Sequence, residues 1–360
     1  MNRWPWYSPA CRKAVDELLK RGGSLSAFRA NKDYGAGPSE GSYAWKLERE
    51  IERKFNVKYA VATNSGTAAL HAGLASLDLR GGDVITSPYT FSATASAILL
   101  AGGKPVFADV DPFTFCITKE TVKRVITKRT KAILPVHLFG GMTDLRGLRE
   151  FGIPVIEDAC QAVGARTPHG WSGTQGLAGC YSFNGSKNIP AGECGALVTN
   201  SSKVAEEARL LMNHGENFGA QVGYNYRPNE LTCCVAYHGL LELEERNQRR
   251  IDLVKRINEH MMWGYKTDGS HVYYVYPFWY GAYDGRAAFI KRMKKRGITV
   301  GAGYIQPPLH HYKAFRKYAD RELPMVDELS FKTLSILYCL TPDKELTYAD
   351  KVAQALRETS

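Results

Sequence analysis

Two residues near the middle of the chain have the types and the spacing that pyridoxal phosphate (PLP) chemistry requires. Lys187 lies in a turn rich in glycine and serine between the apolar runs 179–183 and 195–199, and Asp158 ends an earlier apolar run. In PLP enzymes a lysine amine forms a Schiff base with the cofactor aldehyde, and a carboxylate keeps the pyridine nitrogen protonated. The pair therefore predicts a PLP site. Taken singly, most lysines are surface charges, and an aspartate at a strand end can simply cap a helix.

Other side chains of suitable type also follow predicted strands. Gly66 and Thr67 stand where a helix begins, so that free backbone amides and the helix dipole favour a phosphate. Alone, that turn fits a plain helix cap better. Phe91 is a candidate for stacking on a planar ring, although an aromatic residue there is more often part of the core. Gln161 can reach the same ligand as Asp158 or face solvent. Together these residues indicate a PLP site far more specifically than any one of them does alone.

The elements that would position these residues alternate along the first 200 residues. Short β-rich runs at 59–63, 83–86, 104–108, 132–136 and 154–157 alternate with helical segments at 68–76, 93–101, 118–126 and 145–151. This alternation predicts a parallel α/β sheet covered by helices on both faces. Ligands of such sheets bind at the carboxyl ends of the strands.

The pattern changes after residue 200. Helices are predicted at 204–213, 231–256 and 348–357, together with an aromatic run at 272–278. We expect residues 1–245 to form an N-terminal segment and a large cofactor-binding domain. Residues 246–360 would form a smaller α+β domain, joined to the large one by the long helix.

The composition limits the class of protein. A hydrophobic content of 44% with 23% charged residues is ordinary for a soluble protein, and no run approaches the roughly 20 apolar residues of a membrane span. The N-terminus lacks an apolar signal core, so a cytoplasmic location is expected. The eight cysteines show no zinc-site spacing, which predicts reduced thiols and no metal.

The formal charge of +11 favours anionic partners such as nucleotides, phosphates and nucleic acid. The basic residues are spread along the chain, however. The cluster at 291–296 fits a solvated helix face better than a nucleic-acid site, so a nucleic-acid partner is not expected.

Over nearly its whole length the sequence resembles the DegT/StrS-type sugar aminotransferases, which are PLP enzymes of fold type I in the aspartate aminotransferase superfamily. The matching motifs, in chain order, are Gly37-Pro38, Leu47-Glu48, the turn at 64–67, the segments 135–140 and 157–162, Ser182-Phe183, Lys187, Gly192-Glu193, and the segments 213–215 and 223–227. The resemblance implies a large domain with a mostly parallel seven-stranded sheet covered by helices, and a smaller C-terminal α+β domain.

The resemblance also implies a role for each matching residue. Lys187 would be the Schiff-base lysine, and Asp158 would pair with the pyridine nitrogen. The remaining assignments are Gln161 to the phenolic oxygen, Phe91 to the ring face, Gly66, Thr67 and Ser182 to the phosphate, Asn225 to the phosphate of the other subunit in a homodimer, and His310, Tyr226 and Arg227 to the substrate.

Departures from the family pattern remove no catalytic group. Cys194 stands where glycine is usual, Pro228 where methionine is common, and Cys233 and Cys234 where alanines are usual. The dehydratase branch of the family has histidine in place of the lysine. The presence of Lys187 therefore favours transamination.

We accordingly expect transfer of an amino group from L-glutamate or L-glutamine to a keto-sugar, carried on a nucleoside diphosphate, in amino-sugar biosynthesis. PLP and pyridoxamine phosphate (PMP) would alternate, and the kinetics would be ping-pong. The active sites would lie at a homodimer interface. Two other interpretations stay open: a PLP enzyme acting on a cyclitol or a nucleic-acid-linked substrate, and a PLP-binding regulator without turnover.

Overall fold

A seven-stranded sheet is the framework of the protein in the computed structural model, which describes residues 6–28, 37–215, 221–259, 270–279, 285–301, 305–336 and 345–357. Its strands are β1 (Tyr59–Thr63), β2 (Asp83–Thr86), β3 (Lys104–Phe107), β4 (Thr130–Ile133), β5 (Ile156–Asp158), β8 (Ala178–Ser182) and β9 (Gly195–Thr199). Two ladders, β1-β9-β8-β5 and β4-β2-β3, are joined by parallel bridges from Ile133 to Val155 and from Val136 to Asp158.

The strand order is therefore β1-β9-β8-β5-β4-β2-β3. Only β9 is antiparallel, and it pairs with both β1 and β8. The mostly parallel sheet of seven strands is thus confirmed. The small ribbon of β6 (Arg166–Thr167) and β7 (Gly170–Trp171) lies outside it.

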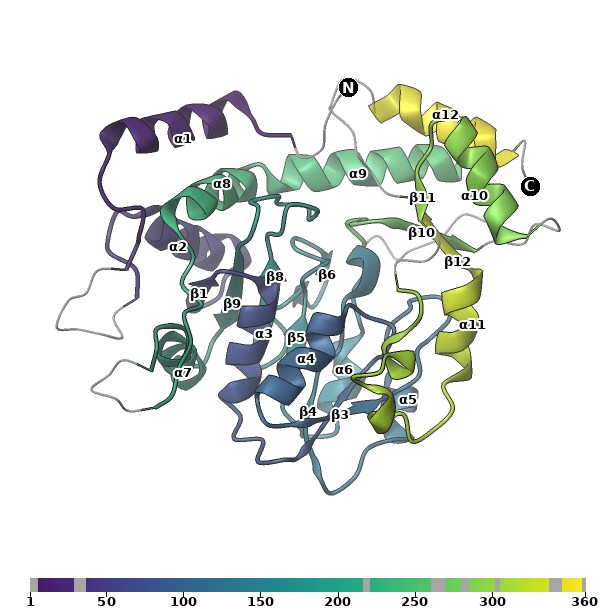
Figure 1. Ribbon diagram of the computed structural model, residues 1–360, viewed down its shortest axis with the longest axis horizontal. Helices are drawn as coiled ribbons and strands as arrows, with labels where there is room; N and C mark the ends of the chain where they lie inside the picture. The colour runs from purple at the N-terminus through teal and green to yellow at the C-terminus, as the bar shows by residue number, and fades with distance from the viewer. Residues whose placement is uncertain are drawn as a thin grey trace.

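Helices cover both faces of the sheet, as Figure 1 shows. Val61 packs with α3 (Gly66–Ala75), α4 (Ser92–Leu100) and α7 (Ser202–Met212) on one face. Its neighbours Ala60 and Ala62 pack with α2 (Tyr43–Phe55) and α8 (Glu230–Leu241) on the other. This is the two-residue alternation of a strand buried on both sides. The short helices α5 (Lys119–Lys123) and α6 (Leu145–Arg149) cover the β2-β3 end, and α1 (Pro9–Arg21) packs on α8.

The predicted helix at 231–256 is two helices, α8 and α9 (Leu243–Asn258), interrupted at Glu242. No proline marks the break, and Gly239 lies inside α8, so the sequence pattern suggested one helix. In Figure 1, α9 runs along the top of the molecule from α8 to the C-terminal elements.

The C-terminal part has its own antiparallel sheet, in the order β10-β12-β11. Its elements are β10 (Tyr276–Trp279), α10 (Arg286–Lys295), β11 (Val300–Gly301), α11 (Pro324–Lys332), β12 (Thr333–Ile336) and α12 (Glu345–Arg357). Apolar side chains of α9, α10 and α12 form one core cluster there. Residues 305–329, which include the 3-10 turns Leu309–His311 and Arg316–Tyr318, instead pack into the core beside β2 and β3. The proposed domain boundary at 245/246 stays a prediction.

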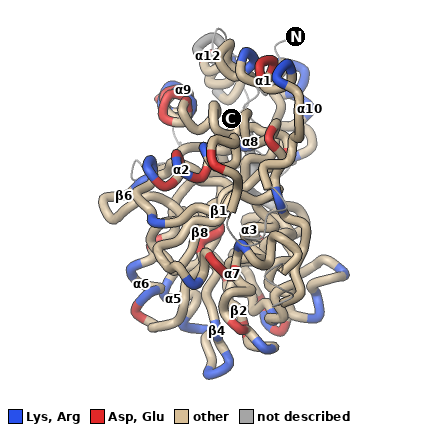
Figure 2. The backbone as a smooth tube through the Cα atoms, turned by 90° about the vertical axis from the view of Figure 1, so that its left-hand side faces the viewer, with Lys and Arg blue, Asp and Glu red and all other residues tan. Residues whose placement is uncertain are grey.

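No described helix is long and apolar enough to cross a membrane. Figure 2 shows Lys and Arg spread from the top to the bottom of the molecule in this view, with Asp and Glu among them. All seven cysteines of the described residues are free thiols; Cys339 lies outside those residues.

A buried ion pair holds the edge strand β1 between two helices. Glu48 of α2 accepts hydrogen bonds from the Ala62 amide at 2.9 Å and from Arg209 of α7 at 2.8 and 3.1 Å. Arg209 also donates to the Ala60 carbonyl at 3.0 Å. Glu48 is buried, and its other cationic contact, the exposed Arg49, lies at 3.8 Å, so loss of Arg209 leaves a poorly compensated charge in the core.

We predict that Arg209→Leu lowers the free energy of unfolding by about 3–5 kcal/mol in urea titrations. The control Lys20→Leu breaks an exposed pair with Asp16 and should cause no measurable change. If both variants lost the same free energy of unfolding, the buried pair of Glu48 would contribute no more to stability than an exposed pair.

Candidate active site

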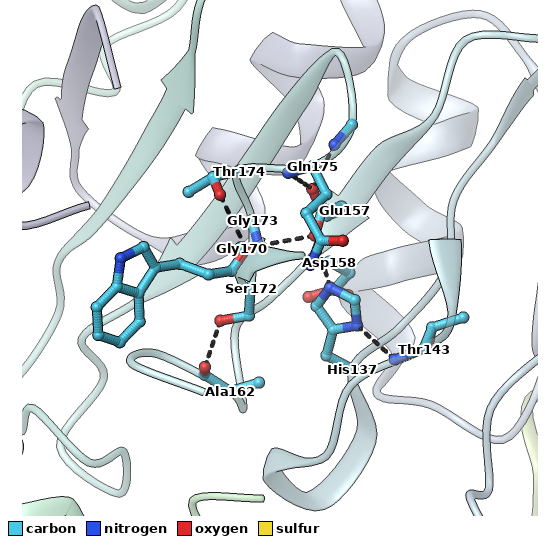
Figure 3. Close-up of polar contacts among 12 residues, drawn as sticks. His137, Thr143, Glu157, Asp158, Ala162, Gly170, Ser172, Gly173, Thr174 and Gln175 are labelled. Atoms are coloured by element: carbon cyan, nitrogen blue, oxygen red, sulfur yellow. Dashed lines mark hydrogen bonds and ion pairs between the residues drawn. The ribbon is translucent and has the colours of Figure 1, made fainter. Parts of the chain in front are cut away.

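Strand β5 ends in two adjacent carboxylates with different surroundings. Glu157, fully buried, accepts hydrogen bonds from the amides of Gly173 (2.7 Å), Gln175 (2.7 Å) and Gly176 (2.6 Å). Its fourth donor is the His137 ring, whose Nε2 lies at 2.7 Å. His137 Nδ1 accepts from the Thr143 amide, so Nε2 carries the proton (Figure 3). Glu157 is therefore fully satisfied within the protein.

Asp158 lies on the opposite face of β5, because successive side chains on a strand alternate. It is 4% exposed and accepts from the Thr94 hydroxyl at 2.7 Å and the Cys160 amide at 3.2 Å. Among the described residues it forms no ion pair. A buried carboxylate with only neutral donors suits a cationic partner, such as a protonated pyridine nitrogen.

A cavity of about 330 Å³ opens in front of Asp158. Seven of the residues predicted from the sequence line it, namely Gly66, Thr67, Phe91, Asp158, Gln161, Ser182 and Lys187. They come from α3, the start of α4, β5 with the turn after it, β8, and the turn between β8 and β9. The carboxyl ends of β5 and β8 thus meet at one edge of the sheet, as expected for an α/β fold.

One end of the cavity is suited to a phosphate. Ser65 caps α3 by accepting from the Ala68 amide, and the amides of Gly66 and Thr67 have no acceptor among the described residues. The helix dipole adds positive potential there. The Ser182 hydroxyl oxygen accepts from the Asn184 amide at 3.3 Å, which leaves its proton for a ligand. A Cβ at Gly66 would stand 2.7 Å from the Cys160 sulfur, so this position excludes larger residues.

Gln161 and Phe91 lie at other walls of the cavity. The Gln161 Oε1 atom accepts from the Phe139 amide at 2.8 Å. Its Nε2 group makes no hydrogen bond within the described part of the chain and can donate to a ligand oxygen. Phe91 is 60% exposed at the start of α4, so its ring is not part of the core.

Lys187 is 9% exposed in the turn between β8 and β9. Its amide donates to the Asn184 carbonyl, and its Nζ lies 4.0 Å from the centre of the Tyr274 ring. Sequence analysis did not select Tyr274, which belongs to the aromatic run at 272–278, nor Thr94, which orients Asp158. Nothing in the residue type of Tyr274 or Thr94, or in the residues around them, predicted these contacts.

Cys160 also lines the cavity. Burial, with a smaller contribution from the Asp158 charge, raises the pKa of the Cys160 thiol well above its usual value.

Four predicted residues do not line this cavity. Asn225 is exposed, and its carbonyl accepts from the Asn64 side chain at 3.2 Å. Tyr226 lies against His71, with its hydroxyl 3.0 Å from His71 Nδ1, and Arg227 donates to Asn213 at 2.5 Å. Their roles stay predictions. The fourth residue, His310, is described next.

His310 and His311 both lie beside Asp327, with Nε2 atoms 3.0 and 2.8 Å from the same carboxylate oxygen. Burial lowers the pKa of His310, and His311 adds to this, while Asp327 acts in the opposite direction. Within the described residues this is the one group that could hold a metal ion. Asp327 contacts both rings through their Nε2 atoms, whereas the buried Nδ1 atom of His310 has no hydrogen-bond partner among the described residues.

A larger cavity of about 570 Å³ lies between residues 111–120 and 142–150. Its basic side chains are paired, Lys119 with Glu150 and Arg146 with Asp144. It contains no unpaired buried carboxylate or lysine among the described residues. The smaller cavity is therefore the better candidate for chemistry.

Comparisons with known proteins agree with this geometry. The family model described as DegT/DnrJ/EryC1/StrS aminotransferase family matches residues 25–357. A "Pleiotropic regulatory protein" of Geobacillus stearothermophilus is 32% identical over 339 residues, covering 88% of this chain and 90% of the relative. The UDP-N-acetyl-3-dehydro-alpha-D-glucosamine 3-aminotransferase of Acidithiobacillus ferrooxidans is 32% identical, covering 89% of each chain. The structure of NtdA from Bacillus subtilis with bound PMP superposes with a TM-score of 0.83 at 24% identity, covering 99% of this chain and 86% of NtdA.

The adjacent carboxylates of β5 allow a matched test. We predict that Glu157→Gln lowers the free energy of unfolding by about 2–4 kcal/mol, because an amide cannot accept from all four donors. Asp158→Asn should change it by less than about 1 kcal/mol and should instead weaken PLP binding. Urea unfolding and PLP titration measure the two effects. A large loss of stability in Asp158→Asn without loss of PLP binding would assign that carboxylate to the fold.

Proposed function

The chain belongs to the DegT/DnrJ/EryC1/StrS aminotransferase family, whose cofactor is PLP, and we propose that it transfers an amino group from L-glutamate or L-glutamine to a keto-sugar carried on a nucleoside diphosphate. The observation that carries the proposal is the convergence of Lys187, Asp158 and the free amides of α3 on one cavity. The resulting amine would serve amino-sugar biosynthesis.

Each side chain of the cavity has a task in this reaction. The amides of Gly66 and Thr67 and the Ser182 hydroxyl would bind the cofactor phosphate, and Gln161 would donate to its phenolic oxygen. Asp158 would hold a proton on the ring nitrogen. PLP supplies an electron-withdrawing ring that makes the α-proton of the amino donor removable. Lys187 Nζ would take that proton and return it in the next step.

The choice of acceptor rests on two observations. The Acidithiobacillus relative is named for amination of a UDP-linked sugar. The net charge of +11 also attracts an anionic nucleotide. Both support a nucleotide-linked keto-sugar, while the ring carbon and the stereochemistry of the product are left open.

We further propose a cytoplasmic homodimer with active sites at the subunit interface. Asn225, Tyr226 and Arg227 lie outside the cavity of their own chain, on a segment where Val222 is among the exposed apolar residues. In a symmetric dimer this segment would complete the cavity of the partner subunit.

A regulatory function is the second candidate, and it is favoured by the name of the Geobacillus relative. A regulator that only bound PLP would have no use for a proton-transfer group. Donor-dependent conversion of the cofactor therefore separates the two functions.

We predict that the purified protein with PLP shows a visible absorption band, and that L-glutamate or L-glutamine replaces it with the near-ultraviolet absorption of PMP. A band that ignores every amino donor would favour the regulator. Absence of any band would overturn the PLP site.

Lys187→Ala should fold and elute like the wild type but retain no PLP after borohydride reduction, as measured by intact mass. The control is Lys46→Ala, which removes a half-buried lysine of α2 whose Nζ lies over the Tyr43 ring. This variant should retain PLP after reduction. Covalent retention by Lys187→Ala would show that another lysine reacts with PLP.

A further inference from the structure

Tyr274 makes two contacts with the turn that carries the reactive lysine. The Lys187 Nζ atom lies over its ring, 4.0 Å from the centroid, and the Tyr274 hydroxyl is 3.1 Å from the Ser186 Oγ atom. Tyr274 is 7% exposed and Lys187 is 9% exposed. A lysine cation on an aromatic face is stabilised more strongly when both groups are largely withdrawn from solvent, as these two residues are.

The backbone around Tyr274 is fixed against the large sheet. The Val272 amide donates to the Gly140 carbonyl at 2.9 Å, and the Val275 amide donates to the Phe139 carbonyl at 3.4 Å. Gly140 has φ +107°, and a Cβ there would stand 2.8 Å from the amide nitrogen of Tyr274. Only glycine permits this approach.

The buried Arg250 of α9 holds the same segment from its other side. Its Nη1 lies 3.4 Å from the carbonyls of both Tyr273 and Tyr274. The backbone that carries the ring is therefore held by contacts that do not involve Lys187.

We propose that Tyr274 is a positioning residue that holds the Lys187 side chain and stabilises its ammonium form between the two proton transfers of the reaction. This role rests on the proposed function. As a neutral amine, Lys187 takes a proton from the donor α-carbon and becomes an ammonium; it then releases that proton and is neutral again. The ring face favours the charged state, and the Ser186 hydroxyl fixes the orientation of the ring.

The contact can be tested without cofactor. In the full-length protein prepared without PLP and labelled with ε-¹³C lysine, the Lys187 methylene signal should be shifted upfield by the ring current of Tyr274. Lys187→Arg assigns the signal. Tyr274→Phe should keep the shift and Tyr274→Leu should abolish it.

The matched control is Tyr43→Leu, since Lys46 Nζ lies 4.7 Å from the centre of the Tyr43 ring. That variant should move the Lys46 signal and leave the Lys187 signal in place. An unshifted Lys187 signal in the wild type would overturn the proposed contact.

The role is tested in the half-reaction with L-glutamate or L-glutamine and their α-deuterated forms. We expect Tyr274→Leu to lower the rate about tenfold and to raise the deuterium isotope effect, with donor affinity little changed. Tyr274→Phe should restore most of the rate. An unchanged rate and isotope effect in Tyr274→Leu, or a loss confined to donor affinity, would overturn the role.

Failure of the proposed function has a different signature. A wild-type protein with the upfield Lys187 signal but no reaction with any amino donor would refute the aminotransferase function for these donors. The contact between Tyr274 and Lys187 would still be supported.

Discussion

The arrangement of the site depends on the hydrogen bonds that the buried Glu157 carboxylate accepts. A buried charge is tolerated here because it accepts four hydrogen bonds. Three come from backbone amides within residues 173–176, and one comes from the His137 ring. These bonds tie the end of β5 to the turn that leads into β8. Since adjacent residues of a strand face opposite sides, the inward position of Glu157 directs Asp158 into the cavity. The fully hydrogen-bonded Glu157 thus fixes the position of Asp158 at the cavity.

The antiparallel strand β9 determines where Lys187 lies in the site. By pairing with β8 it brings the chain back after a turn of twelve residues, which carries Lys187 at the same sheet edge as Asp158. The N-terminus of α3 opens at this edge as well, so the anion-binding amides, the carboxylate and the lysine face one space. Tyr274, from the C-terminal part of the chain, contacts the side chain of this lysine.

The sequence carried enough information for the sheet and for most of the cavity, because both depend on local patterns. Apolar runs predicted the strands, and the residue types after those runs predicted Lys187, Asp158 and Gly66. Contacts between distant segments were not predictable in this way. Tyr274 lies 87 residues from Lys187 in an aromatic run to which the sequence assigned no element and no role, and no proline marks the break at Glu242. The packing of residues 305–329 beside β2 and β3 likewise follows from tertiary contacts alone.

The burial of Cys160 has a consequence for chemical selectivity. A thiolate beside an aldehyde is a strong competing nucleophile, and its adduct would withdraw the aldehyde from the lysine. Burial raises the pKa of Cys160 well above its usual value, and the nearby Asp158 charge acts in the same direction. A raised pKa lowers the fraction of thiolate, which makes the sulfur a poorer nucleophile. The protein can thus keep a sulfur atom in the wall of the cavity, close to Gly66, without a strong competitor for the amine that we propose to react.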